Sequence, residues 1–142
     1  MKPNNLKIIH DKYAPYWAIA LFILLGTGLL ASSFNFGRFW KGYILDMVGP
    51  AWAYILFRGL YTTKANNLWT QFFTPNRTLI IFITVCFGIE ALQYFKVYDS
   101  TFDFWDLLAY ITILTPLFFI DKKIIQKGNK SPFTKSLNKK QP

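Results

Sequence analysis

The sequence has very few of the residues that build disulfide-bonded or metal-stabilised folds. It contains one cysteine, Cys86, and one histidine, His10. A single cysteine excludes a disulfide framework within the chain and a Cys-x-x-Cys motif. A single histidine excludes a metal site built from several histidines of one chain. No serine or cysteine has a neighbouring histidine that would act as its general base. We therefore expect no cofactor and no metal.

Acidic residues are also scarce, with seven Asp and Glu against 16 Lys and Arg and a net charge of +9 at pH 7. The cations gather near the C-terminus, at Lys122, Lys123, Lys127, Lys130, Lys135, Lys139 and Lys140. A basic tail can bind nucleic acid, but directly after an apolar run it is typical of the cytoplasmic flank of a membrane helix. We predict that this tail contacts anionic lipid headgroups and that the protein has no nucleic-acid partner.

Apolar side chains are abundant, since 53% of the residues are hydrophobic and 20% are aromatic. A soluble domain of this length has too little interior to bury so much apolar surface. Four apolar segments stand out, at 16–34, 43–61, 78–95 and 105–120. Each approaches the ~20 residues that cross ~30 Å of hydrocarbon. The sequence predicts an all-α, polytopic membrane protein with four transmembrane helices.

The same pattern divides the chain into three parts. We expect a cytoplasmic N-terminal segment at 1–15, a four-helix transmembrane domain at 16–121, and a basic, disordered cytoplasmic tail at 122–142. Thr74 followed by Pro75 predicts a helix start, and Asp103 predicts a second. Residues 66–73 mix apolar and polar side chains, which favours a short helix lying flat at the membrane interface.

The distribution of cations predicts the orientation. Twelve of them fall in the N-terminus, the loop between the second and third segments, and the C-terminal tail, whereas three fall in the other two loops. Cytoplasmic loops are enriched in Lys and Arg. Both termini are therefore expected in the cytoplasm. Arg58, near the inner end of the second segment, is expected to extend towards water.

Polar side chains converge at one depth of the predicted bundle. With both termini inside, six residues fall on its outer half, and we take them as candidate ligand-binding residues: Arg38, Asp46, Glu90, Gln93, Asp103 and Asp106. Each acid within the membrane costs a few kcal/mol unless it is paired, protonated or hydrated. The pattern predicts an outward-facing pocket of acids and amides, and nothing comparable on the inner half.

Simpler roles also fit these residues. Asp103 can serve as a helix cap, and Asp106 can favour the positive end of the helix dipole. Glu90 and Gln93 can form hydrogen bonds between helices.

The runs from Gly88 to Phe95 (GIEALQYF) and from Asp103 to Tyr110 (DFWDLLAY) carry a family resemblance. They resemble the E-x-x-Q and D-x-x-D signature of VanZ-like proteins, and more closely a related family of small bacterial membrane proteins of unknown function. That family tends to carry an acid in its second helix, here Asp46. The resemblance covers about residues 40–120 and implies a role in the cell envelope, with a bacterial cytoplasmic (inner) membrane as the expected localisation. The chain departs from typical VanZ-like proteins at Tyr110 and Ile113, which replace Asn and Gly.

Three classes of function fit these features. The first is a binding or accessory protein whose pocket engages a lipid-linked or glycan group, a membrane-protein partner or a second copy of the chain. The second is a membrane-embedded enzyme acting on an envelope lipid, with Glu90 as general acid or base and Asp46 or Asp106 orienting the substrate. The third is an oligomeric transporter.

The orientation is tested with reporters that are active only in the periplasm. A reporter fused after Pro142 should be silent and one inserted at Lys41 should be active, because the cations are concentrated on the side of the termini. The activity of the reporter enzyme is measured in intact cells for both fusions. The reverse pattern would show that the orientation is inverted.

Overall fold

The computed structural model describes residues 3–34, 37–62, 67–97 and 102–129. Within these ranges the chain is helical and contains no strand, which confirms the all-α prediction. The helices are α1 (Pro3–Ser33), α2 (Arg38–Arg58), α3 (Leu68–Phe72), α4 (Pro75–Tyr94) and α5 (Phe104–Asn129).

Three helical stretches are long and apolar enough to cross a membrane, namely Ile9–Ser33, Pro75–Tyr94 and Phe104–Gln126. Large apolar side chains remain exposed along them, including those of Phe22 and Phe119. A contiguous apolar surface of this kind is expected where lipid surrounds the protein. These helices identify a membrane protein. The remaining long helix, α2, spans 21 residues but carries four charged residues, so it is not among these three stretches.

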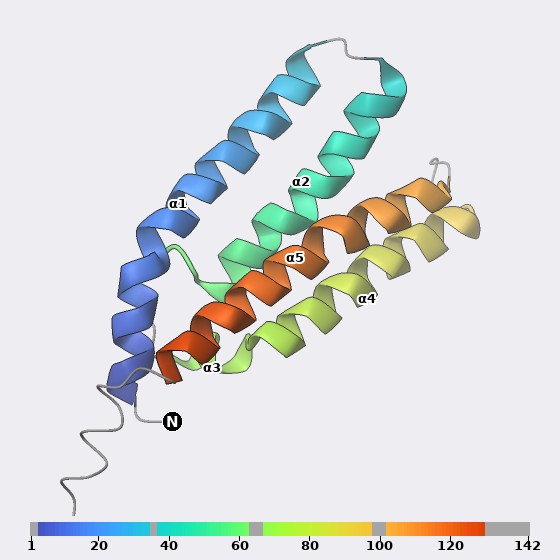
Figure 1. The fold of residues 1–142 in the computed structure, drawn as a ribbon. Helices are drawn as coiled ribbons and strands as arrows, with labels where there is room; N and C mark the ends of the chain where they lie inside the picture. The colour runs from blue at the N-terminus through green and yellow to red at the C-terminus, as the bar shows by residue number, and fades with distance from the viewer. Residues whose placement is uncertain (1–2, 35–36, 63–66, 98–101, 130–142) are drawn as a thin grey trace, which may run out of the picture.

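The four long helices run in alternating directions (Figure 1). The start of α1, the end of α2, the short α3, the start of α4 and the end of α5 lie together at what we call the basal end. The other ends of the long helices form the distal side. Helix α2 contacts α1, α4 and α5, and α5 also contacts α1 and α4. The buried core contains Trp17, Tyr54, Ile55, Leu60 and Leu114.

Two predicted helix starts are confirmed. The Thr74 Oγ1 atom accepts a hydrogen bond from the Arg77 amide at 3.4 Å, and Pro75 is the first residue of α4. The Asp103 Oδ1 atom accepts from the Trp105 amide at 3.0 Å where α5 begins. Both side chains satisfy amides that have no partner within the helix.

Helix α3 falls within the predicted interfacial segment 66–73. Its start is a capping box, in which the Asn67 Oδ1 atom accepts from the Thr70 amide and the Thr70 hydroxyl accepts from the Asn67 amide. The Trp69 indole donates to the Phe57 carbonyl at 2.7 Å. This bond fixes α3 against the end of α2 and leaves Leu68 85% exposed.

Helices α1 and α5 extend beyond their predicted apolar cores. Helix α1 begins before Tyr16 and continues through Pro15, and α5 continues past Ile120. The added turns pack against the buried core through Tyr13 and Ile124, and this packing stabilises them as helix. The predicted tail therefore starts within α5, and its residues 130–142 lie outside the described ranges.

Helix α2 ends at a glycine that adopts a left-handed conformation. Gly59 has φ 62°, and the Leu60 amide donates to the Ile55 carbonyl at 3.2 Å, as in a Schellman motif. A Cβ atom at Gly59 would lie 3.3 Å from the Thr70 Cγ2 atom. Glycine thus lets the chain turn sharply while α3 packs against the turn.

Replacing this glycine tests the turn. Gly59→Ala should lower the free energy of unfolding by about 1–2 kcal/mol, because a left-handed backbone disfavours a Cβ atom. Gly42→Ala is the matched control, since it lies inside α2 and its Cβ atom would meet nothing within 4 Å. Thermal melting in detergent should show a loss only for Gly59→Ala. Equal melting of the two variants would contradict this account.

Candidate functional site

Four acids from three elements of the distal side form one cluster. This acid cluster comprises Asp46 on α2, Glu90 on α4, Asp106 on α5 and Asp103 immediately before α5. The carboxyl groups of Asp46 and Asp106 share a hydrogen bond, and Asp46 lies within electrostatic range of Glu90 and Asp103. The structure thus brings together acids that are up to 60 positions apart in the chain.

Glu90 is enclosed by protein and does not face lipid, since its side chain is 1% exposed. The Tyr110 hydroxyl donates to the Glu90 Oε1 atom at 3.0 Å, and the main chain of Asp103 also hydrogen-bonds the carboxylate. Tyr110 was not among the predicted site residues. Its spacing could have indicated it, because Tyr110 lies four residues after Asp106 and therefore on the same face of α5.

The other predicted residues are placed less centrally. Gln93 is half-buried, one turn along α4 from Glu90. Asp103 accepts the hydrogen bond that caps α5, so its position has a structural explanation. The side chain of Arg38 lies outside the part of the chain that the structure describes.

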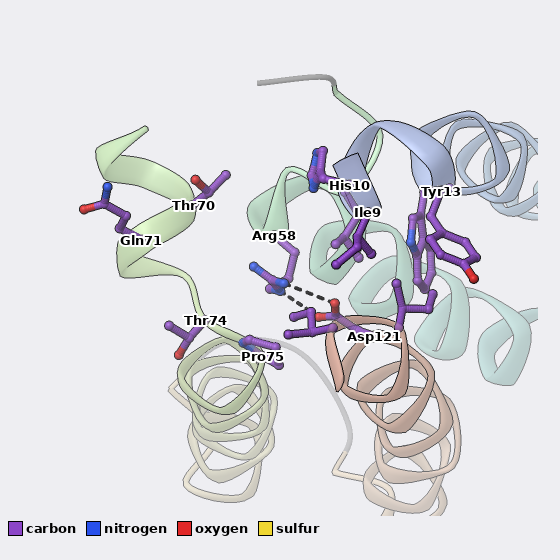
Figure 2. Close-up of a pocket in the computed structure, with 13 residues that line it drawn as sticks. Ile9, His10, Tyr13, Arg58, Thr70, Gln71, Thr74, Pro75 and Asp121 are labelled. Atoms are coloured by element: carbon purple, nitrogen blue, oxygen red, sulfur yellow. Dashed lines mark hydrogen bonds and ion pairs between the residues drawn. The ribbon is translucent and has the colours of Figure 1, made fainter. Parts of the chain in front are cut away.

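A second polar cluster lies at the basal end, where the sequence predicted nothing comparable. The Arg58 Nε atom donates to Asp121 Oδ2 at 2.7 Å, and Nη2 donates to Oδ1 at 3.1 Å (Figure 2). The Tyr54 hydroxyl donates to Asp121 Oδ2 at 3.0 Å, and Arg58 Nη1 donates to the Phe73 carbonyl at 2.6 Å. The expectation that Arg58 extends towards water is wrong, because Arg58 is only 6% exposed.

Both clusters join α2 to α5. Tyr54 and Arg58 are four residues apart and therefore lie on one face of α2, whereas Asp46 precedes Arg58 by twelve residues, which turns it by about 120° around the axis. At 1.5 Å per residue, Asp46 and Arg58 are ~18 Å apart along the axis. Partners on α5 meet them at both positions, so polar contacts join the parallel helices α2 and α5 at two levels.

The arrangement of the acid cluster bears on which ligands it can bind. Among the residues that the structure describes, no three His, Cys, Asp or Glu side chains are arranged to hold a metal ion. The carboxyl groups of Asp46 and Asp106 lie within hydrogen-bonding distance of each other. A carboxylate has about four acceptor positions. The pair is therefore rich in acceptors and can receive hydrogen bonds from hydroxyl or ammonium groups.

Comparison of the chain with protein-family models, with curated protein sequences and with solved structures finds no match. The chemistry of both clusters is therefore inferred from their geometry.

Substitution of Asp121 tests how strongly the basal cluster holds α2 to α5. Asp121→Leu should cost about 3–5 kcal/mol of unfolding free energy, because it leaves the buried guanidinium of Arg58 without its counter-charge. The double variant Arg58→Met/Asp121→Leu should lose clearly less than the sum of the single losses. Lys122→Leu, which removes the exposed neighbouring charge, should melt like the wild type. Additive losses in denaturation experiments would show that the two side chains are not coupled.

Proposed function

We propose that α2 is a fourth transmembrane helix, and that the chain crosses a bacterial cytoplasmic membrane four times. Its 21 residues reach ~30 Å at 1.5 Å per residue. Polar groups in lipid must be satisfied within the protein. Of the two ionisable residues well inside α2, Arg58 forms an ion pair with Asp121 of α5, and the Asp46 carboxyl group faces that of Asp106. A helix whose charges face neighbouring helices need not be as apolar as a helix that faces lipid.

The surface supports the same proposal with both termini in the cytoplasm. The basal end carries exposed cations, including Lys12, Arg77 and Lys122, as cytoplasmic flanks do. Exposed aromatic side chains near the distal ends of the helices suit the opposite membrane interface: Phe34, Tyr94, Phe95, Phe104 and Trp105. In this orientation the acid cluster lies in the outer half of the membrane.

The function we propose is that of a VanZ-like envelope protein that binds a lipid-linked or glycan group, alone or as an accessory subunit. The observation that carries it is the convergence of Asp46, Glu90 and Asp106 from three helices. Such acids are costly within a membrane. Glu90 is satisfied by Tyr110, whereas the Asp46–Asp106 pair keeps acceptor positions that a ligand rich in hydroxyl or ammonium groups can fill.

The family resemblance supports the same class. The residues that match the E-x-x-Q and D-x-x-D signature are Glu90, Gln93, Asp103 and Asp106, and three of these four belong to the acid cluster. The short motifs therefore coincide with a spatial cluster and are not scattered over the bundle. On this basis we place the protein in the cell envelope.

A second candidate function is an enzyme acting on an envelope lipid. The hydrogen bond between the Asp46 and Asp106 carboxyl groups favours it, because two acids that share a proton can give and take one during a reaction. Both side chains are half-buried, whereas Glu90 is enclosed. In this alternative the aspartate pair exchanges the proton and Glu90, held by Tyr110, orients the pair.

Replacing the acids by amides tests the binding function. Asp46→Asn, Glu90→Gln and Asp106→Asn should each remove the same lipid or lipid-linked saccharide from the molecules that co-purify with the wild type, measured by mass spectrometry. Double variants should lose little more, because residues that act as a unit are not additive. Asp11→Asn is the matched control, an acid of the basal end that should leave the ligand in place.

The same samples separate binding from catalysis and from simple packing. A new, larger lipid retained by the amide variants would indicate a blocked reaction and favour the enzyme. If the bound ligand decreases only as much as the amount of folded protein decreases, the acids stabilise the packing of the helices and the proposal is wrong.

A further inference from the structure

A cavity of about 280 Å³ lies at the basal end, beside the Arg58–Asp121 pair. Helix α1 and the end of α5 form one wall, and α3 with the start of α4 forms another (Figure 2). Most of its lining is apolar, from Ile9, Tyr13, Trp17, Leu60, Pro75, Ile124 and Ile125. Polar atoms reach it from Arg58, Asp121 and His10, and from Thr70, Gln71 and Thr74.

Two hydrogen-bonding groups of this lining have unused capacity. The His10 Nε2 atom is buried and has no partner among the described residues. Buried polar atoms without partners are rare and costly. Asp121 and the Phe73 carbonyl engage three of the five N–H groups of Arg58, so two remain to donate. An imidazole with its proton on Nε2 would be a second donor.

The charges around the cavity favour an anion. Exposed cations surround it at the basal end, including Lys12, Arg77 and Lys123, and no described acid forms an ion pair with them. Asp121, the acid in the lining, is neutralised by Arg58. A ligand with phosphate oxygens would thus meet a buried guanidinium and an imidazole within a positive field.

The position of the cavity indicates where such a ligand comes from. Helix α3 flanks it through Thr70 and Gln71, while its Leu68 and Trp69 side chains are exposed. Exposed Leu and Trp on a short helix are suited to the headgroup level of a bilayer. The cavity therefore lies at the depth where lipid phosphates are found.

We propose that this cavity binds the phosphate headgroup of an anionic membrane phospholipid. Its phosphate oxygens accept hydrogen bonds from Arg58 and His10. The adjoining glycerol packs against apolar lining such as Tyr13 and Ile125, and the acyl chains remain in the bilayer. This site lies at the opposite end of α2 from the acid cluster, and it does not depend on the ligand proposed there.

The test is native mass spectrometry of the full-length protein in detergent, titrated with phosphatidylglycerol and, separately, with phosphatidylcholine. The wild type should bind one phosphatidylglycerol preferentially. His10→Phe should weaken this binding about tenfold or more, because it removes a hydrogen bond to a charged group and fills the cavity. Ile125→Phe fills the cavity from α5 without touching the polar groups and should have the same effect, which keeps the test decisive if His10→Phe does not fold.

Controls separate the site from surface charge and from free phosphate. Lys122→Gln removes an exposed basal charge outside the cavity and should retain the bound lipid. Equal binding of phosphatidylcholine, or unchanged binding in both cavity-filling variants, would overturn the proposal. Displacement of the lipid by millimolar inorganic phosphate would also overturn it, because the site would then serve a soluble anion.

Discussion

The buried ion pair between Arg58 and Asp121 is the constraint on which the basal half of the protein depends. A buried guanidinium without its carboxylate is strongly unfavourable, so α2 and α5 must meet in the register that joins these two side chains. The same guanidinium donates to the Phe73 carbonyl, which holds the link between α3 and α4 against the bundle. The hydroxyl of Tyr54 donates a further hydrogen bond to the Asp121 carboxylate. Three segments of the chain are thereby positioned by one charged group, and the cavity beside it forms as a consequence.

Helix α2 explains how a charged helix can lie at the centre of an apolar bundle. It contacts the other three long helices, and two of its ionisable side chains meet α5, with Asp46 beside Asp106 and Arg58 paired with Asp121. Helices α1, α4 and α5 contain the long apolar stretches that suit contact with lipid. In a membrane there is little hydrophobic difference between a neighbouring helix and a lipid tail, so polar contacts and close packing hold helices together. The two polar levels along α2 supply such contacts.

The two ends of α2 have opposite chemistry. At the distal end, the Asp46–Asp106 pair has more acceptors than donors, which suits hydroxyl or ammonium groups. At the basal end, Arg58 and His10 have donor capacity in a cationic environment, which suits a phosphate. A molecule that suits one end would meet the opposite chemistry at the other. We propose that the two ends of α2 recognise different chemical groups.

The amino-acid pattern alone was sufficient for the helical class, for three apolar spans, for the caps at Thr74 and Asp103, and for the common depth of Asp46, Glu90 and Asp106. These features depend on local periodicity, on capping chemistry and on counting residues along a helix of known rise. The pairing of Glu90 with Tyr110, and of Arg58 with Asp121, depends on how helices far apart in the chain rotate against one another. Apolar segments specify that rotation weakly, because many rotations bury similar area. For this reason Asp121, at the end of an apolar run, could be read from the sequence only as a boundary residue, and packing made it the partner of Arg58.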